Sequence, residues 1–235
     1  MTDTIERQVE GIGGWLTPKE GRLLYELAKR CTGRGVIVEI GSWKGKSTIW
    51  LANGSRGGAA IPVYAIDPHT ATSDNLATQS AASTFAEFIE NIRRAGVADL
   101  VVPMVTTSAE AARGFSRPVE LIFIDGAHDY ASVALDFELW FPRVVEGGTL
   151  AFHDTVAWEG PRRLVAQRVF RGAWARRASF VDSTTIAEKV RRNSLGDRVR
   201  NRYVLGLKRM GDAGARLRMP APIRHAGRRL LERLS

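Results

Sequence analysis

The sequence of 235 residues contains a single cysteine, Cys31. One thiol cannot form an internal disulfide or a cysteine-based zinc site, and such scarcity is typical of proteins from reducing compartments. We therefore interpret Cys31 as a packing or surface residue and not as a nucleophile.

Membrane and export signals are also missing. No run approaches the roughly 20 consecutive apolar residues that a transmembrane helix needs. The N-terminal residues, MTDTIERQVEG, are polar and acidic and lack the apolar core of a secretory signal peptide. These absences predict a cytoplasmic protein without a transmembrane segment.

Positive charge is scarce in the first two thirds of the chain and abundant in the last third. Residues 1–158 carry 14 Lys and Arg against 19 Asp and Glu, a net charge of −5, whereas residues 159–235 carry 20 against 6, a net charge of +14. This asymmetry is typical of a solvated arginine-rich surface, or of contact with nucleic acid, an anionic membrane surface or an acidic partner. No helix-turn-helix, zinc-finger or aromatic RNA-binding signature accompanies the arginines, so nucleic acid is not the expected partner.

Short apolar runs recur at intervals that are too long for hairpins. They are VIVEI (36–40), VYAID (63–67), LVVPMV (100–105), ELIFID (120–125) and GTLAFHD (148–154). Most are almost unbroken, as in strands that are buried on both faces, and helical patterns lie between them. The alternation predicts a Rossmann-like, doubly wound α/β fold: a seven-stranded, mostly parallel sheet with helices on both faces.

The remaining segments complete this expected architecture. Residues 160–172 read as a helix, 178–184 and 202–209 as the last two strands, and 185–201 as a flexible or partly helical insertion. The predicted organisation is an N-terminal helical or lid segment (1–30), a main domain (31–210) and a basic tail or helix (211–235).

The glycine-rich residues 39–48, EIGSWKGKST, resemble part of a nucleotide-binding loop. GKS (45–47) matches the end of the P-loop pattern, but Gly41 is one residue too close to it. A loop that is one residue shorter does not easily surround a phosphate. The run LIFID (121–125) could still supply a magnesium-binding Asp, so an NTPase remains a weaker alternative.

Acidic residues at two consecutive strand ends favour a different ligand. Glu39 lies at the end of the first strand, two residues before Gly41, and Asp67 ends the second. A carboxylate at the position of Asp67 can accept both hydroxyl groups of a ribose. Together these acids favour a nucleoside without phosphates on the loop, and S-adenosylmethionine fits that description.

The sequence resembles a known family in this region. GSWKGKS (41–47) is similar to the glycine loop of catechol-type, class I S-adenosylmethionine-dependent O-methyltransferases. Residues 124–155 resemble an antibiotic-tailoring and sugar- or polysaccharide-modifying subgroup, methyltransferase family 24. The resemblance covers about residues 30–155 and makes residues 31–210 the expected S-adenosylmethionine-binding domain. It implies that the cofactor is contacted by Glu39, Gly41, Ser42, Gly45, Ser47, Asp67, Ser108 and Asp125.

Two further carboxylates indicate a metal site. Asp125 ends the fourth predicted strand and Asp154 the fifth, and the carboxyl ends of parallel strands open on the same edge. Oxygen ligands of this kind suit Mg²⁺, which would lower the pKa of a hydroxyl acceptor.

Two histidines accompany these acids. His128 follows Asp125 by three residues, where the resemblance implies a catalytic base, and imidazole titrates near neutral pH. Asp129 either orients His128 or, as we expect, caps the next helix. His153 departs from the family pattern, and it could bind a softer ion such as Mn²⁺, pack against the sheet or assist the base. The candidate catalytic residues are His128, Asp125 and His153, the candidate metal ligands are Asp125, Asp154 and His153, and a metal-free base mechanism stays open.

The substrate pocket is expected among residues 11–21, 68–83 and 154–163, where Trp15 or Trp158 could stack on a sugar.

The leading hypothesis is a dimeric O-methyltransferase that acts on a hydroxyl of a sugar, polysaccharide or natural product, with a small-molecule or oligosaccharide acceptor. The alternative is a non-catalytic module that binds RNA or an anionic surface through its basic C-terminal third.

Overall fold

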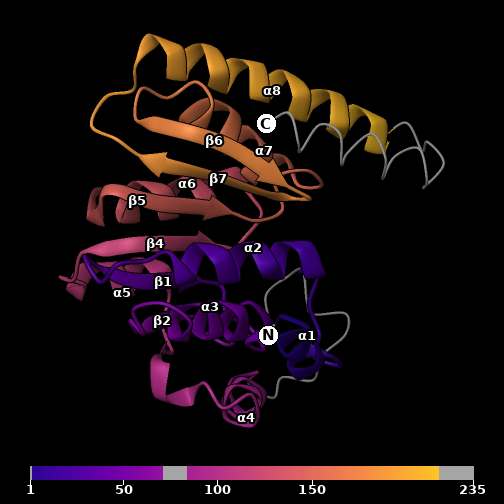
Figure 1. The fold of residues 1–235 in the computed structure, drawn as a ribbon, viewed down its shortest axis with the longest axis vertical. Coiled ribbons are helices and arrows are strands. Elements are labelled where there is room, and N and C mark those ends of the chain that lie inside the picture. Colours follow the sequence, from indigo (N-terminus) through magenta and orange to yellow (C-terminus); the bar gives the residue numbers. More distant parts are fainter. Residues whose placement is uncertain (1, 71–83, 217–235) are drawn as a thin grey trace.

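The computed structural model describes residues 2–70 and 84–216. These residues form a seven-stranded sheet in the order β3-β2-β1-β4-β5-β7-β6 (Figure 1). The strands are β1 (Val36–Ile40), β2 (Val63–Ile66), β3 (Val101–Met104), β4 (Val119–Ile124), β5 (Val144–Phe152), β6 (Ala175–Val181) and β7 (Thr184–Lys189). Strands β1 to β5 pair in parallel, and only β7 pairs antiparallel with its two neighbours. The prediction of a mostly parallel, Rossmann-like sheet is confirmed.

The order of the strands reverses between β1 and β4. These two strands are adjacent in the sheet, although β2 and β3 lie between them in the chain. Every residue of β1 and of β4 is buried, which explains why their sequences are apolar except for Glu39 and Glu120. In such sheets ligands bind at the carboxyl ends of the strands beside the reversal point.

The path of the chain between β1 and β4 explains this reversal. The segment between Ile40 and Val119 contains β2 and β3, which are added on one side of β1, and the chain then returns to place β4 on the other side. The carboxyl ends of β1, β2, β4 and β5 therefore lie next to one another, and the residues that follow these strands share one edge of the sheet.

Helices cover both faces of the sheet. They are α1 (Thr2–Val9), α2 (Pro18–Lys29), α3 (Lys46–Arg56), α4 (Phe85–Arg94), α5 (Ser108–Gly114), α6 (Tyr130–Trp140), α7 (Glu159–Leu164) and α8 (Leu195–Arg216). Apolar residues of α1 to α4 form a core with one face of the sheet, and those of α5 to α8 form a core with the other. Trp50 and Trp140 are buried in these two cores, as their helical patterns predicted. Within the described residues, no helix has the length and apolar character needed to cross a membrane.

The end of the chain differs from the sequence-based prediction. Residues 202–209 were expected to be the last strand, but they belong to α8, and β7 lies in the stretch that was expected to be an insertion. The buried side chains in and around this run are Asn201, Val204, Leu205, Leu207 and Lys208, and they follow the spacing of a helix. Alternation of apolar and polar residues over 202–209 was too short to distinguish the two periods.

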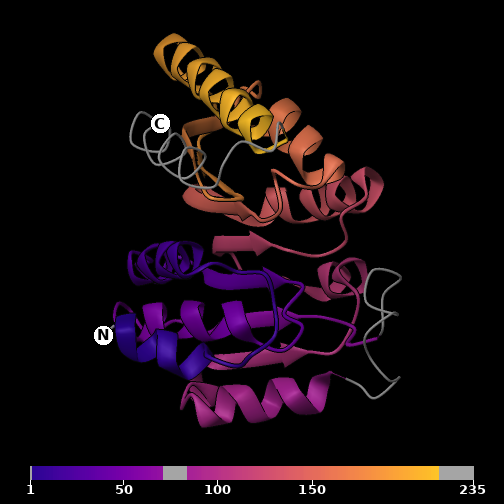
Figure 2. The same ribbon diagram turned by 90° about the vertical axis from the view of Figure 1, so that its right-hand side faces the viewer.

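Helix α8 lies along the outer side of β6, at the opposite end of the molecule from α4 in both views (Figures 1 and 2). The Asn201 Nδ2 atom donates a hydrogen bond to the Ala175 carbonyl at 2.8 Å, and the Arg200 Nη1 atom donates to the Ala178 carbonyl at 2.9 Å. These side chains satisfy carbonyl groups of an edge strand that would otherwise be open to pairing with another chain.

Close packing of α2 against α3 provides a test of the fold. A Cβ atom at Gly21 of α2 would lie 2.4 Å from the Trp50 ring, which is buried and cannot move away. We expect Gly21→Ala to lower the free energy of unfolding by about 1–3 kcal/mol, as overpacked cores do. Urea unfolding followed by circular dichroism measures this change.

The matched control is Gly206→Ala in α8, where an added Cβ atom would meet nothing within 4 Å. This change should leave stability unaltered or raise it by up to about 1 kcal/mol, because Ala favours the helix. Equal stability of the two variants would contradict the described packing of α2 on α3.

Candidate active site

The glycine loop between β1 and α3 lies directly against the turn that follows β4. Gly41 has a positive φ of 87°, and a Cβ atom there would lie 2.1 Å from the Asp125 carbonyl oxygen. The hydrogen bonds of the sheet continue through this region. The Gly41 amide donates to the Ile66 carbonyl at 2.9 Å, and the Asp125 amide donates to the Ile40 carbonyl at 2.8 Å. Only glycine permits this close approach of the loop to the strand end.

Glu39 lies beneath the loop and is fully buried. The Thr48 Oγ1 atom of α3 donates a hydrogen bond to Glu39 Oε2. Burial raises the pKa of Glu39 to about 8; hydrogen bonds from Ser47 and Thr48 oppose this shift, and the nearby carboxylates of Asp125 and Asp67 add to it. A carboxyl group in this environment holds its proton at neutral pH.

Two polar atoms near the loop lack hydrogen-bond partners. Within the described residues, Glu39 Oε1 and Ser42 Oγ are buried and make no hydrogen bond. Buried polar atoms are rarely left unsatisfied, so their presence beside a glycine loop indicates a position for a polar ligand.

Asp67 joins the glycine loop to the segment after β2. Its Oδ2 atom accepts a hydrogen bond from the Trp43 amide at 2.8 Å, and its Oδ1 atom accepts one from the His69 amide at 2.7 Å. Each carboxylate oxygen keeps a further acceptor position for a ligand. Ser108, at the start of α5, accepts a hydrogen bond from Trp140 Nε1 at 2.8 Å.

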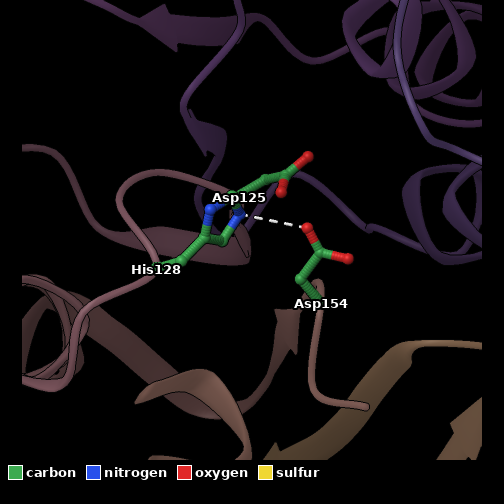
Figure 3. Close-up of side chains that lie close together, drawn as sticks. All are labelled: Asp125, His128 and Asp154. Atoms are coloured by element: carbon green, nitrogen blue, oxygen red, sulfur yellow. Dashed lines mark ion pairs between the residues drawn. The ribbon is translucent and has the colours of Figure 1, made fainter. Parts of the chain in front are cut away.

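Asp125, His128 and Asp154 converge at the carboxyl ends of β4 and β5 (Figure 3). One ligand atom from each residue lies within 4.8 Å of those from the other two. The His128 Nε2 atom lies 3.0 Å from Asp154 Oδ2. Two carboxylates and one imidazole in this arrangement could hold a divalent cation or move a proton.

Neighbouring residues fix the orientation of His128. The ring of Trp158 stacks on its imidazole, with 4.4 Å between ring centroids and an interplanar angle of 11°. Asp129 caps α6 by accepting a hydrogen bond from the Ser132 amide at 2.9 Å, which confirms the capping role. Asp154 has a positive φ of 55°, an uncommon conformation for a non-glycine residue that is often found at functional sites.

His153 lies behind this group, between two acids from distant parts of the chain. Its Nδ1 atom is 3.0 Å from Asp125 Oδ1, and its Nε2 atom is 3.4 Å from Glu20 Oε2. The structure thus brings Asp125 and Asp154 together with His128, whereas both ring nitrogens of His153 face carboxylates. Direct binding of a metal by His153 stays a prediction.

Glu20 was not identified from the sequence. It is fully buried, and its Oε1 atom accepts hydrogen bonds from the Ser183 amide at 2.8 Å and the Thr184 hydroxyl at 3.0 Å. Its Oε2 atom accepts one from the Thr17 amide at 3.0 Å and completes a capping box at the start of α2. The spacing Thr17-x-x-Glu20 after a glycine-rich stretch was a detectable signal for the cap, although not for the contact with His153.

The histidine and the carboxylates of this cluster stabilise one another's charged forms. Burial by itself lowers the pKa of His153, but Asp125, Asp154 and Glu20 together raise it well above its usual value. Burial by itself raises the pKa of Glu20, but hydrogen bonding and the charge of His153 lower it to about 2. Burial dominates at Asp125 and raises its pKa, although the charge of His153 opposes the shift. We infer an imidazolium at His153 between two carboxylates.

Two predicted pocket residues lie near this edge. Trp158 is exposed beside His128, and Trp15 is exposed and stacks on Trp43, with 5.6 Å between ring centroids. Most of the predicted polar loop, residues 71–83, lies outside the described residues. Stacking of either tryptophan on an acceptor stays a prediction.

Comparisons with known proteins agree with this architecture. A family model described as "Methyltransferase domain" matches residues 38–155. An O-methyltransferase from Bacillus cereus in complex with SAH is 22% identical, with a TM-score of 0.57 over 80% of this chain and 91% of that chain. The O-methyltransferase TomG from Streptomyces achromogenes, involved in tomaymycin synthesis and in complex with SAM, is 20% identical, with a TM-score of 0.54 over 80% and 87%. The O-methyltransferase NovP is 16% identical, with a TM-score of 0.61 over 81% and 89%.

The matched residues include the glycine loop, Asp67, Asp125, His128 and Asp154. The chain therefore belongs to the methyltransferase domain family, as the resemblance of its sequence implied, and it shares the fold of solved class I methyltransferases.

The buried Glu39 predicts a specific dependence of stability on pH. The folded protein keeps the Glu39 proton up to a pKa of about 8, whereas the ordinary pKa is 4.5. The contribution of Glu39 to the free energy of unfolding is therefore fully present below pH 4.5, its ordinary pKa. This contribution is lost as the pH rises through the pKa of about 8 in the folded protein. Between about pH 6 and about pH 8.5, we expect the free energy of unfolding to fall more in the wild type than in Glu39→Gln, measured by urea unfolding.

The Gln side chain keeps an acceptor for Thr48 but cannot ionise. Glu26→Gln, at an exposed position of α2, should retain the pH dependence of the wild type. If the free energy of unfolding falls equally with pH in Glu39→Gln and Glu26→Gln, ionisation of Glu39 is not the cause of the pH dependence.

Proposed function

We propose that the chain is an S-adenosylmethionine-dependent O-methyltransferase, assisted by a divalent cation, that methylates a hydroxyl group of a sugar, polysaccharide or natural product. The observation that carries this proposal is the pair of His128 Nε2 and Asp154 Oδ2, 3.0 Å apart and beside Asp125. The family match and the names of similar O-methyltransferases support it.

The residues around the glycine loop fit S-adenosylmethionine better than a nucleoside triphosphate. Glu39 Oε1 and Ser42 Oγ are unsatisfied acceptor and hydroxyl atoms that suit the ammonium and carboxylate groups of the methionine portion. Asp67 suits the ribose hydroxyls. Asp125, whose backbone lies against the loop, disfavours phosphates, because its carboxylate would repel them when ionised.

His128 is the base in this proposal. Stacking on Trp158 holds the plane of its ring, and Asp154 stabilises the imidazolium that forms when His128 accepts the proton of the acceptor hydroxyl. S-adenosylmethionine supplies an electrophilic methyl group, whose carbon–sulfur bond breaks as the carbon–oxygen bond forms. Catalysis then depends mainly on positioning and on local electrostatics.

Asp125 and Asp154 are the residues that would hold the cation. Their oxygen atoms suit Mg²⁺, and a nitrogen ligand from a histidine would favour a softer ion such as Mn²⁺. A bound cation would lower the pKa of the acceptor hydroxyl. The imidazolium of His153 contacts Asp125 from behind and limits the repulsion between the carboxylates when no cation is bound.

The exposed ring of Trp158 supports a sugar or another flat, partly apolar acceptor. One face of the ring is stacked on His128, so an acceptor that contacts the exposed edge of the ring would have a hydroxyl near the proposed base. Aromatic rings provide such contacts with little loss of side-chain entropy.

Transfer of radiolabelled methyl groups from S-adenosylmethionine tests the function directly. Sugars, glycosides and phenolic natural products are incubated with the protein in the presence of Mg²⁺, Mn²⁺ or EDTA. We expect labelled O-methyl products, and EDTA should lower the rate by about tenfold or more through loss of the cation. Undiminished transfer in EDTA would overturn the metal assignment, and label found only on nitrogen or carbon would overturn O-methylation.

Removal of the proposed base should separate chemistry from cofactor binding. We expect His128→Gln to lower kcat by about 10²–10⁴-fold, because the acceptor loses its proton acceptor. The affinity for S-adenosylhomocysteine, measured by calorimetry, should stay close to that of the wild type.

The matched variant is Asp67→Asn, which changes the predicted ribose contact with almost no change in side-chain volume. It should weaken S-adenosylhomocysteine binding by about tenfold or more, through the loss of a charged acceptor for ribose hydroxyls. A kcat equal to that of the wild type in His128→Gln would contradict the role of His128 as the base. Unchanged affinity for S-adenosylhomocysteine in Asp67→Asn would contradict the proposed cofactor site.

A further inference from the structure

Helix α8 has two faces of different character. Its inner face packs on β6 and contains Asn201, Val204, Leu205, Lys208 and Asp212, which are all buried. Lys208 Nζ donates hydrogen bonds to the Thr155 carbonyl at 2.7 Å and to Asp212 Oδ2 at 3.1 Å. The inner face therefore attaches the helix to the domain.

The outer face exposes large apolar side chains. The exposed fractions are 75% for Leu195, 62% for Val199, 54% for Tyr203 and 66% for Met210. With about 100° of rotation per residue, these four side chains fall within an arc of about 80°, whose centre is opposite the buried face. The stripe is interrupted at Gly206, which falls within the same arc between Tyr203 and Met210. Large apolar side chains gathered on the solvent side of a helix are unusual in a globular domain and indicate an interaction surface.

Arginines border this stripe. On a helical wheel Arg198, Arg202 and Arg209 lie along one side of it. Arg200 lies on the other side, where its Nη1 atom donates to the Ala178 carbonyl of β6. The two acids of α8 within the described side chains are engaged elsewhere, since Asp197 accepts a hydrogen bond from the Ser194 hydroxyl at 2.6 Å and Asp212 pairs with Lys208. The outer face thus combines apolar side chains with positive charge.

This combination distinguishes between three kinds of partner. A second copy of the chain would cover the apolar stripe, but it would also bring two sets of arginines together. RNA phosphates would pair with the arginines, but RNA binding would leave the apolar side chains of Leu195, Val199 and Met210 exposed to water. An anionic bilayer satisfies both parts, because the acyl boundary accepts the apolar side chains while the lipid phosphates pair with the arginines.

We propose that the outer face of α8 is a peripheral binding surface for anionic phospholipid bilayers, with the helix lying in the plane of the interface. Among the described elements, none lies over this face, since α8 runs along the outer side of β6 (Figures 1 and 2). The sequence beyond α8 adds positive charge, with five arginines and one glutamate in residues 217–235. This inference goes beyond the proposed function and does not depend on methyl transfer.

Vesicle flotation with the full chain tests the proposal. The protein should bind vesicles of equimolar phosphatidylglycerol and phosphatidylcholine but not vesicles of phosphatidylcholine alone, and binding should weaken as salt is raised. The double variants Tyr203→Ser with Met210→Ser, and Arg202→Gln with Arg209→Gln, should each lower the partition coefficient by about tenfold or more.

The control variant is Leu135→Ser, at an apolar position of α6 that is 50% exposed. It should bind as the wild type does, and circular dichroism should show that every variant remains folded. Equal binding by Leu135→Ser and by the apolar double variant would overturn the proposal.

Three further outcomes would also overturn it. Loss of vesicle binding only in Arg228→Gln with Arg229→Gln would place the surface in residues 217–235. A wild-type dimer that becomes monomeric in the apolar double variant, without a change in vesicle binding, would identify the stripe as a contact between two copies. Salt-sensitive binding of polyuridylate that exceeds vesicle binding, and that needs only the arginines, would identify RNA as the partner.

Discussion

The close contact between Gly41 and the Asp125 carbonyl is the constraint on which the site depends. A side chain at position 41 would collide with the backbone after β4, so the glycine loop can lie against that strand end only because Gly41 has no Cβ atom. This contact fixes the loop beside Asp125 and lets the Trp43 amide reach Asp67. A single steric requirement therefore brings the proposed cofactor residues and the proposed chemical residues to the same edge of the sheet.

A buried chain of charges then connects this edge to the N-terminal segment. His153 lies between Asp125 and Glu20, and Glu20 in turn binds the turn between β6 and β7 through Ser183. Removing one member of such a cluster leaves an unpaired buried charge, which costs far more than the loss of an exposed ion pair. The N-terminal helices are thus attached to the chemical centre by electrostatics as well as by apolar packing against α3.

The sequence was sufficient to predict features that follow from local pattern and a topological rule. The five parallel strands have nearly unbroken apolar runs, and the rule that parallel strands open on one edge brings Asp67, Asp125 and Asp154 together. Contacts between distant segments carry no such pattern, so Glu20 was missed although its contact with His153 is close. The error at residues 202–209 has another cause, because a run of eight residues with mixed apolar and polar character fits both periods. The inner face of α8 becomes evident only when its buried residues are followed from Asn201 to Asp212.

The uneven distribution of charge acquires a physical meaning in this structure. The acidic part of the chain, net −5 over residues 1–158, contains the loops and strand ends of the site, whereas the basic part, net +14 over residues 159–235, includes α8. An anionic surface would attract the basic part and repel the acidic part, so it would orient the molecule before any side chain inserts. Helix α8 borders the sheet beyond β6, whereas the site lies at the carboxyl ends of β1, β4 and β5. Attachment through α8 is therefore compatible with an open site, since the two surfaces use different sides of the sheet.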